Sequence, residues 1–234
     1  MRCFRDRIAI RHFRLGTERL PVGSYIGYSP KGSSEVSRQS RDTCFAVKLV
    51  RETEFSRFMR YLANEITTNR LFAEIFDEES ILVPMPRSSP VVKDGLWPSE
   101  SVAQSLLSLG IGSAVVPMLR RTVAVTKSAT ASKGNRPTPK IHMNSMALDV
   151  DMSIEGNIVL IDDVVTLGAT MLAAKLMFSA AAPWLDVRGF APIRTMGLQP
   201  EVHTLIDPWI SEVYGTEDWS NRTEKRFVGK PQQD

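Results

Sequence analysis

Short apolar runs alternate along the chain with stretches in which apolar residues recur every three to four positions. This alternation is typical of strands followed by helices. The clearest run is Ile158–Ile161, four consecutive β-forming residues that predict a strand buried on both faces. Ile81–Val83 predicts a second buried strand, which the Pro-Met-Pro sequence at 84–86 stops. Further extended segments are predicted over residues 114–119, 144–150 and 187–193.

Three segments have helical patterns. Residues 53–77 carry a stripe of large apolar side chains with a short phase slip near Asn69. Ser99 is placed to cap a helix that ends at Gly110, and Ala169–Ala181 is rich in strong helix formers. Strands that alternate with helices predict an α/β fold with a parallel sheet and right-handed crossovers.

The two ends of the chain have weaker patterns. In the first 50 residues, Ser24–Tyr28 and Thr43–Val50 are predicted as strands around a polar loop at Ser29–Asp42. Residues 195–234 are polar and are predicted to be irregular. The chain therefore divides into a basic extension at 1–52, a core at 53–194 and a C-terminal extension at 195–234.

Composition sets limits on the class of protein. The chain has 234 residues, of which 43% are hydrophobic and 24% charged, so a wholly disordered chain is excluded. No run of 18 apolar residues is present, so no transmembrane helix and no membrane partner are expected. Cys3 and Cys44 have no metal-ligand spacing, and reduced thiols in a cytoplasmic protein are the expectation.

The positive charge of the chain is concentrated in two places. Residues 1–51 contain eleven Lys and Arg but four Asp and Glu. Residues 119–142 contain six basic residues and no acidic one. Such segments are either solvated surface or part of a site for phosphate, pyrophosphate or nucleic acid.

The stretch from Ile158 to Met171 holds the strongest candidate chemistry. A buried strand delivers Asp162 and Asp163 at its C-terminal end, where open α/β sheets bind ligands. Gly168 then allows a tight turn into a helix whose free N–H groups form an anion site. Thr166 and Thr170 add hydroxyl groups. The layout suits a ligand with both a phosphate and vicinal hydroxyls, such as a ribose 5-phosphate, or a Mg²⁺ shell.

This stretch resembles the motif of type I phosphoribosyltransferases that binds 5-phosphoribosyl 1-pyrophosphate (PRPP). The family pattern is an apolar strand, two acidic residues, two apolar residues and a Thr-Thr-Gly-x-Thr loop. The matching residues here are Asp162-Asp163, Val164-Val165 and Thr166-Leu167-Gly168-Ala169-Thr170. Leu167 departs from the pattern, because Thr or Ser is usual there and one hydroxyl to the 5-phosphate is lost.

The order of the other segments also resembles this family, nearest to its competence-associated members. Those proteins have a Val-Pro-x-Pro turn, which matches Val83–Pro86, although their usual Arg-Gly-x-Asn-Gln run is absent afterwards. The basic segment at 120–140 corresponds to the flexible catalytic loop of the family. The resemblance implies a type I phosphoribosyltransferase-like parallel sheet flanked by helices, with a separate hood formed by the chain ends.

The resemblance also implies roles for individual residues. Asp162 and Asp163 would be the catalytic pair that holds the ribose hydroxyls, directly or through Mg²⁺, with water between metal and carboxylate as one arrangement. The 5-phosphate would be bound by Val165, Thr166, Leu167, Gly168, Ala169 and Thr170. Pyrophosphate would face Arg87, Ser88 and Ser89. The leaving group would be covered by Lys127, Lys133 or Arg136.

Three functions remain open from the sequence. The chain is an active phosphoribosyltransferase that releases pyrophosphate, or a non-catalytic module that senses PRPP or a nucleotide, or a protein that binds nucleic acid through its basic segments. Leu167 favours the second function, and the charge of residues 1–51 favours the third. A homodimer or a complex with a partner protein is also expected.

Overall fold

The structure is a computed structural model that describes residues 18–90, 95–126, 137–197, 201–216 and 221–226. The main sheet consists of β1 (Arg19–Tyr28), β2 (Ile81–Pro84), β3 (Ala114–Val115), β6 (Asn157–Ile161), β7 (Val164–Val165), β8 (Asp186–Thr195), β9 (Ile206–Gly215) and β10 (Asn221–Arg226). A separate two-stranded sheet pairs β4 (Leu119–Arg121) with β5 (Met146–Leu148). The helices are α1 (Glu35–Lys48), α2 (Glu52–Thr67), α3 (Pro98–Ser108), α4 (Pro139–Asn144) and α5 (Ala169–Ala181).

The main sheet is mostly parallel, which confirms the predicted mixed α/β class. Its strand order is β10-β9-β1-β8-β6-β2-β3, and β7 pairs with β8 outside this path. The pairs from β1 through β8, β6 and β2 to β3 are all parallel, whereas β9 and β10 are antiparallel additions at one edge. Parallel strands carry their carboxyl ends to one edge of the sheet, and this edge is where open α/β sheets bind ligands.

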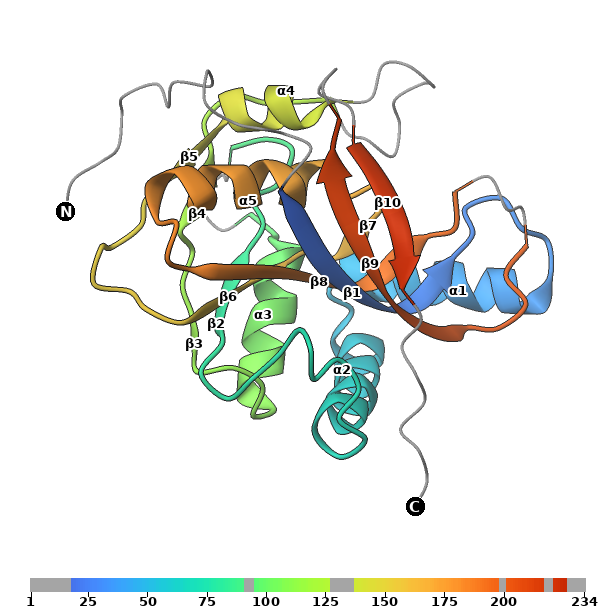
Figure 1. The fold of residues 1–234 in the computed structure, drawn as a ribbon. Coiled ribbons are helices and arrows are strands. Elements are labelled where there is room, and N and C mark those ends of the chain that lie inside the picture. The colour runs from blue at the N-terminus through green and yellow to red at the C-terminus, as the bar shows by residue number, and fades with distance from the viewer. Residues whose placement is uncertain (1–17, 91–94, 127–136, 198–200, 217–220, 227–234) are drawn as a thin grey trace.

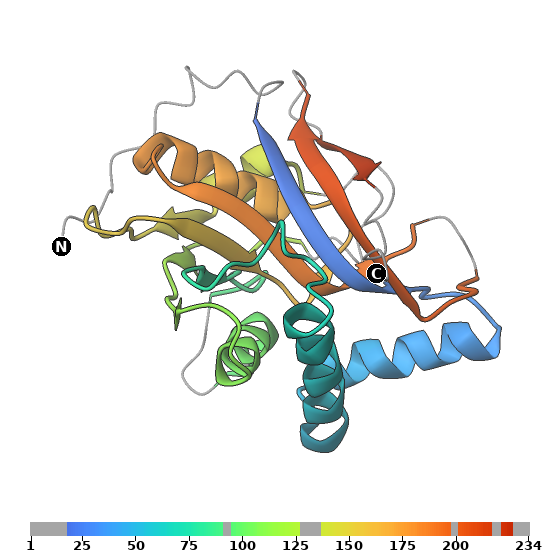
Figure 2. The ribbon, with the colours of Figure 1, turned by 60° about the horizontal axis from the view of Figure 1, so that its bottom comes forward.

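Helices cover both faces of the sheet, as Figures 1 and 2 show from two sides. On one face, α5 packs with α4 and the small β4–β5 sheet over residues such as Leu160 and Leu172. On the other face, α1, α2 and α3 bury a second cluster that includes Met59, Leu106 and Phe190. The strands between the two clusters are buried on both faces, as the apolar run at 158–161 predicted.

The prediction for the N-terminal segment was wrong. Residues 29–42 are not a loop, and 43–50 are not a strand, because both lie largely within α1. The helix begins at the N-cap Ser34, whose hydroxyl accepts a hydrogen bond from the backbone N–H of Ser37. Its buried side includes Ser37 and Ser40, so the apolar periodicity that marks a helix is missing from the sequence.

The prediction of irregular structure after residue 195 was also wrong, because β9 and β10 lie there. Pro208 concealed β9, since proline is poorly tolerated inside a strand. The register of β9 against β1 shifts between the pairs Ser24–Trp209 and Ile26–Ile206, and Pro208 lies within this irregularity. Proline is accepted at such positions because no ladder hydrogen bond is lost there.

The described parts of the N-terminal and C-terminal extensions therefore contribute strands to the main sheet. β1 pairs with β8 on one side and with β9 on the other, so the described parts of 1–52 and 195–234 meet beside the core strand β8. The expected separate hood is not formed by these segments. The charge pattern and length of the chain ends did not indicate that they complete a sheet.

Several smaller boundaries also differ from prediction. α2 ends at Thr67 and not at residue 77, because Arg70 and Phe72 adopt positive φ angles of 50° and 66° that no α-helix contains. Phe72 is nevertheless buried in the core. α3 has Trp97 as its N-cap and Pro98 in its first turn, so Ser99 is inside the helix and does not cap it.

Among the described residues, no helix combines the length and the apolarity needed to cross a membrane.

Candidate functional site

The carboxyl ends of β2 and β6 lie side by side at one edge of the sheet. The backbone N–H of Met85 donates to the carbonyl oxygen of Ile161 at 2.7 Å, one residue beyond the end of β2. The N–H of Asp162 donates to the carbonyl of Phe190 in β8 at 3.0 Å. The turn that follows β2 and the acidic pair that follows β6 therefore begin next to each other, although 76 positions separate them in the sequence.

The turn at 84–89 is held from α3. The carbonyl oxygen of Met85 accepts hydrogen bonds from the indole Nε1 of Trp97 at 2.8 Å and from the hydroxyl of Ser99 at 2.6 Å. The predicted capping residue thus has a different task, which is to anchor this turn. Arg87, Ser88 and Ser89 follow directly and are half-buried.

Asp162 and Asp163 form a close acidic pair. The backbone N–H of Asp163 donates to Oδ1 of Asp162 at 2.9 Å, and both residues are half-buried. Burial raises the pKa of Asp162 well above its usual range, and the neighbouring charge of Asp163 raises it further. Lys48 at the end of α1 opposes this effect by lowering the pKa. Such a pair is expected where a cation or several hydroxyl groups are to be bound.

The residues from Val164 to Gly168 are fixed against β8 and β9. β7 places Val164 and Val165 in register with Ile193 and Arg194 of β8. The hydroxyl groups of Thr166 and Thr195 lie 3.3 Å apart. Gly168 adopts a φ of 74°, and a Cβ atom there would lie 2.8 Å from Cγ2 of Val213 in β9. The glycine is needed for its left-handed backbone and for its close approach to β9.

The first backbone N–H groups of α5 lie outside the hydrogen bonds within the helix. Gly168 is its N-cap and supplies no side-chain hydrogen bond, and the first intrahelical bond runs from the N–H of Leu172 to the carbonyl of Gly168 at 2.8 Å. The N–H groups of Ala169, Thr170 and Met171 therefore precede the hydrogen-bonded part of the helix. These groups and the helix dipole favour an anion. Leu167 is 45% exposed, and its side chain adds no donor.

The beginning of the basic segment lies along the turn after β2. Nε of Arg121 donates to the carbonyl of Arg87 at 2.9 Å, and the N–H of Val125 donates to the carbonyl of Ser88 at 2.8 Å. Burial lowers the pKa of Arg121 to about 10, and the negative charge of Asp162 partly compensates. Arg121 therefore stays cationic at neutral pH and is near enough to Asp162 for their charges to interact.

Sequence reasoning missed the contribution of α1 because it read that segment as loop and strand. Burial raises the pKa of the Cys44 thiol to about 11, with Lys48 lowering it and Asp163 raising it. Lys48 is thus near enough to Asp162 for their charges to interact, and Cys44, a neutral thiol, lies near Asp163. The sequence of α1, with its alternating charges and buried serines, does not indicate that this helix lies near the acidic pair.

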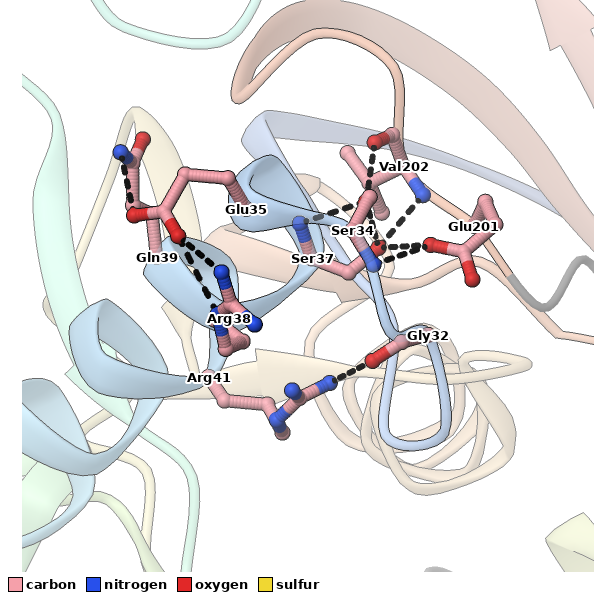
Figure 3. Close-up of polar contacts among 9 residues, drawn as sticks. All are labelled: Gly32, Ser34, Glu35, Ser37, Arg38, Gln39, Arg41, Glu201 and Val202. Carbon is pink, nitrogen blue, oxygen red and sulfur yellow. Dashed lines mark hydrogen bonds and ion pairs between the residues drawn. The ribbon is translucent and has the colours of Figure 1, made fainter.

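The start of α1 is held by Glu201, as Figure 3 shows. Its carboxylate accepts hydrogen bonds from the backbone N–H groups of Ser33 and Ser34 and from the hydroxyl of Ser37. These bonds hold the pKa of Glu201 far below its usual range. The carboxylate therefore acts as an ionic cap on α1, and it fixes the helix that carries Lys48.

The structure brings together one part of the predicted site and does not describe another. The acidic pair, the residues 165–170 and the turn with Arg87, Ser88 and Ser89 lie at one sheet edge. Lys127, Lys133 and Arg136 lie outside the described residues, as do residues 1–17 of the basic N-terminal extension. Within the described part of the chain, no group of three or more His, Cys, Asp or Glu side chains is arranged to hold a metal ion.

The comparisons with known proteins give no assignment. No protein-family model matches the chain. No match is found among curated proteins either. The family resemblance therefore rests on the motif residues of the sequence.

Proposed function

We propose that this protein binds PRPP, or a nucleotide with a ribose 5-phosphate, and transfers the phosphoribosyl group to a base with release of pyrophosphate. One observation supports this proposal above the others. The hydrogen bond from Met85 to Ile161 places a basic, hydroxyl-bearing turn beside an acidic pair that leads into a helix N-terminus. PRPP carries a pyrophosphate, a ribose diol and a 5-phosphate, and each has a chemically matched partner at this edge.

The assignment of groups follows from charge and hydrogen-bonding capacity. The 5-phosphate is assigned to residues 165–170, where the N–H groups at the start of α5 favour an anion. The ribose hydroxyls are assigned to Asp162 and Asp163, which accept hydrogen bonds when ionised. The pyrophosphate is assigned to Arg87, Ser88 and Ser89, next to the cationic Arg121.

A Mg²⁺ ion fits the chemistry of this site. The ion commonly uses one or two carboxylates and completes its shell with water and substrate phosphates, so a cage of three or more protein ligands is not required. Asp162 and Asp163 supply the carboxylates, and a bound cation would offset the burial and the neighbouring negative charge that raise the pKa of Asp162. When bound, Mg²⁺ supplies positive charge against the pyrophosphate.

The proposed reaction is a displacement at C1 of the ribose. The bond from C1 to the pyrophosphate oxygen breaks with its electron pair leaving on pyrophosphate, and a nitrogen of the acceptor base forms the new bond to C1. The nitrogen loses its proton to solvent. Positive charge develops on the ribose in the transition state, between loss of pyrophosphate and formation of the new bond. The negative carboxylates of Asp162 and Asp163 beside the ribose stabilise this charge.

A second candidate function is a PRPP or nucleotide sensor without turnover. Leu167 supports it, because its half-exposed side chain takes the place of a hydroxyl that would otherwise bind the 5-phosphate. A hydrogen bond to a charged group contributes about 1.5–3 kcal/mol, so its loss weakens ligand binding by about tenfold or more. The same site residues serve both functions.

Calorimetric titration with PRPP and Mg²⁺, followed by a pyrophosphate-release assay against a panel of bases, tests the proposal. Binding with release supports the transferase, and binding without release supports the sensor. Asp162→Asn and Asp163→Asn should abolish binding. Asp186→Asn is the matched control, because Asp186 begins β8 at the opposite end of that strand. Absence of binding to the wild-type protein, or binding that survives both site substitutions, refutes the proposal.

A further inference from the structure

A chain of buried polar contacts connects the turn after β2 to the start of α5. Arg121 donates from Nε to the carbonyl of Arg87 and from Nη1 to the hydroxyl of Ser145, at 2.9 and 2.7 Å. The Ser145 hydroxyl donates to the carbonyl of His142 at 2.9 Å. Nε2 of His142 lies 3.2 Å from Oγ1 of Thr170 in the first turn of α5. This chain of contacts connects the loop that the proposed function assigns to pyrophosphate with the loop that it assigns to the 5-phosphate.

The three central members of this chain of contacts are shielded from water, whereas Arg87 and Thr170 at its two ends are half-buried. Arg121, His142 and Ser145 are exposed by 5%, 3% and 4% respectively. Figure 1 shows α4, which carries His142, lying alongside α5. A polar network buried to this degree rigidifies the groups that it joins.

His142 is neutral in this setting and so carries a single ring proton. Burial lowers the pKa of His142 to about 4, and the positive charge of Arg121 lowers it as well. The remaining question is which ring nitrogen holds the proton. Nδ1 is buried with no hydrogen-bond partner in the described residues, whereas Nε2 faces the Thr170 hydroxyl.

The two tautomers leave different groups unsatisfied. With the proton on Nδ1, a buried N–H donor has no acceptor, which is rare in folded proteins. With the proton on Nε2, the N–H donates to Oγ1 of Thr170 and only a lone pair on Nδ1 is left without a partner. The second arrangement also occupies Thr170 as an acceptor, so its own hydroxyl proton is free to donate elsewhere.

We propose that His142 is a positioning residue for the proposed 5-phosphate site. Its Nε2–H donates to Oγ1 of Thr170 and thereby turns the Thr170 hydroxyl proton toward an anion at the start of α5. The inference rests on the proposed function for its ligand. At the other end of this chain of contacts, Arg121 donates to the carbonyl of Arg87. The buried guanidinium of Arg121 thus connects the two loops that are proposed to bind phosphate groups.

The first test reads the tautomer directly in the wild-type protein without ligand. A ¹⁵N–¹H correlation spectrum of the histidine ring should show the one-bond proton coupling on Nε2 of His142. A proton on Nδ1 overturns the inference. This measurement is independent of whether the protein binds PRPP, so it separates the inference from the proposed function.

The second test measures the affinity for ribose 5-phosphate by calorimetry. His142→Leu should weaken binding about tenfold, because the charged hydrogen bond from Thr170 is no longer directed. His142→Gln places an amide N–H near the position of Nε2 and should restore most of the affinity. His203→Leu changes an exposed histidine and should leave the affinity unchanged. In a Thr170→Val background, His142→Leu should have no further effect.

The outcomes separate the proposed function from the role of His142. If the wild-type protein does not bind ribose 5-phosphate, the proposed function fails. If it binds and His142→Leu binds equally well, the inference alone fails. If His142→Leu does not fold, the Gln variant and the ring spectrum still decide, since loss of affinity in a folded Gln variant contradicts the role of the Nε2 donor.

Discussion

Gly168 and Val213 approach so closely that a Cβ on the glycine would lie 2.8 Å from Cγ2 of the valine. The contact joins the loop after the acidic pair to β9, a strand that comes 45 positions later in the sequence. The side chain of Val213 in β9 therefore packs against the loop at Gly168 and helps to hold its left-handed turn. This relationship links the proposed phosphate site to the C-terminal part of the sheet.

Gly168→Ala should lower the free energy of unfolding by about 1–3 kcal/mol, because it combines a strained φ with a steric conflict. Urea denaturation measures the change. Gly110→Ala is the matched control, since Gly110 has a φ of 83° but open space around its Cβ position. Gly168→Ala should cost more than this control, and adding Val213→Ala should recover part of the difference. Equal losses at the two glycines would contradict the steric part of the argument.

Asp162→Asn should raise the stability of the ligand-free protein at neutral pH. The raised pKa of Asp162 means that its ionised form is disfavoured by folding, so stability falls as pH rises above the ordinary carboxyl value of 3.8. Asn keeps the shape without the charge, and a gain of about 1–3 kcal/mol is expected from relief of the desolvated carboxylate. Thermal melts at several pH values check this. If Asp162→Asn is less stable than the wild-type protein at pH 7, the prediction is wrong, whatever the effect of the substitution on ligand binding.

Folding stability should also depend on the protonation of His142. Its pKa is about 4 in the folded protein and 6.5 ordinarily, so the unfolded chain binds more protons between these values. The contribution is fully present above about pH 6.5 and is lost as pH falls toward 4, by roughly 2–3 kcal/mol. His142→Gln should flatten this part of the stability profile. An unchanged profile, with His203→Gln as the reference, would show that His142 does not titrate as described.

Leu167→Thr should tighten binding of ribose 5-phosphate by about tenfold, because it adds a hydroxyl donor beside the N–H groups of α5. The position is 45% exposed, so the change in folding free energy should stay within about 0.5 kcal/mol. Leu167→Ala removes the side chain without adding a donor and should not tighten binding. Tightening by both variants would indicate steric relief and not a new hydrogen bond.

The part of the fold that could be predicted is the part whose signals are local. The strand at 157–161, the acidic pair and the helix at 169–181 follow one another directly, and each has its own pattern of apolar residues or helix formers. α1 could not be recognised because serines occupy positions of its buried side. β9 was concealed by Pro208, whose effect depends on an irregularity in strand pairing that the sequence does not reveal.

The same distinction applies to the candidate site. Residues 162–170 are contiguous and were predicted as a unit. The contact between His142 and Thr170 joins residues 28 positions apart, and His142 has no sequence neighbour that marks it as part of a site. The basic segment drew attention to Arg121 only through its charge, whereas its buried position depends on the packing of β4 against β5.

The placement of β1 has a consequence for the order in which the protein is built. β1 is the first described strand, yet both of its neighbours, β8 and β9, belong to the last third of the chain. During synthesis the strand has no partner until residues beyond 186 have left the ribosome, so the centre of the sheet closes late. Long-range pairing of this kind slows folding and leaves an apolar strand unprotected in the nascent chain. A chain cut before β8 would keep the acidic pair and α5 but lack the strand on which β1 assembles.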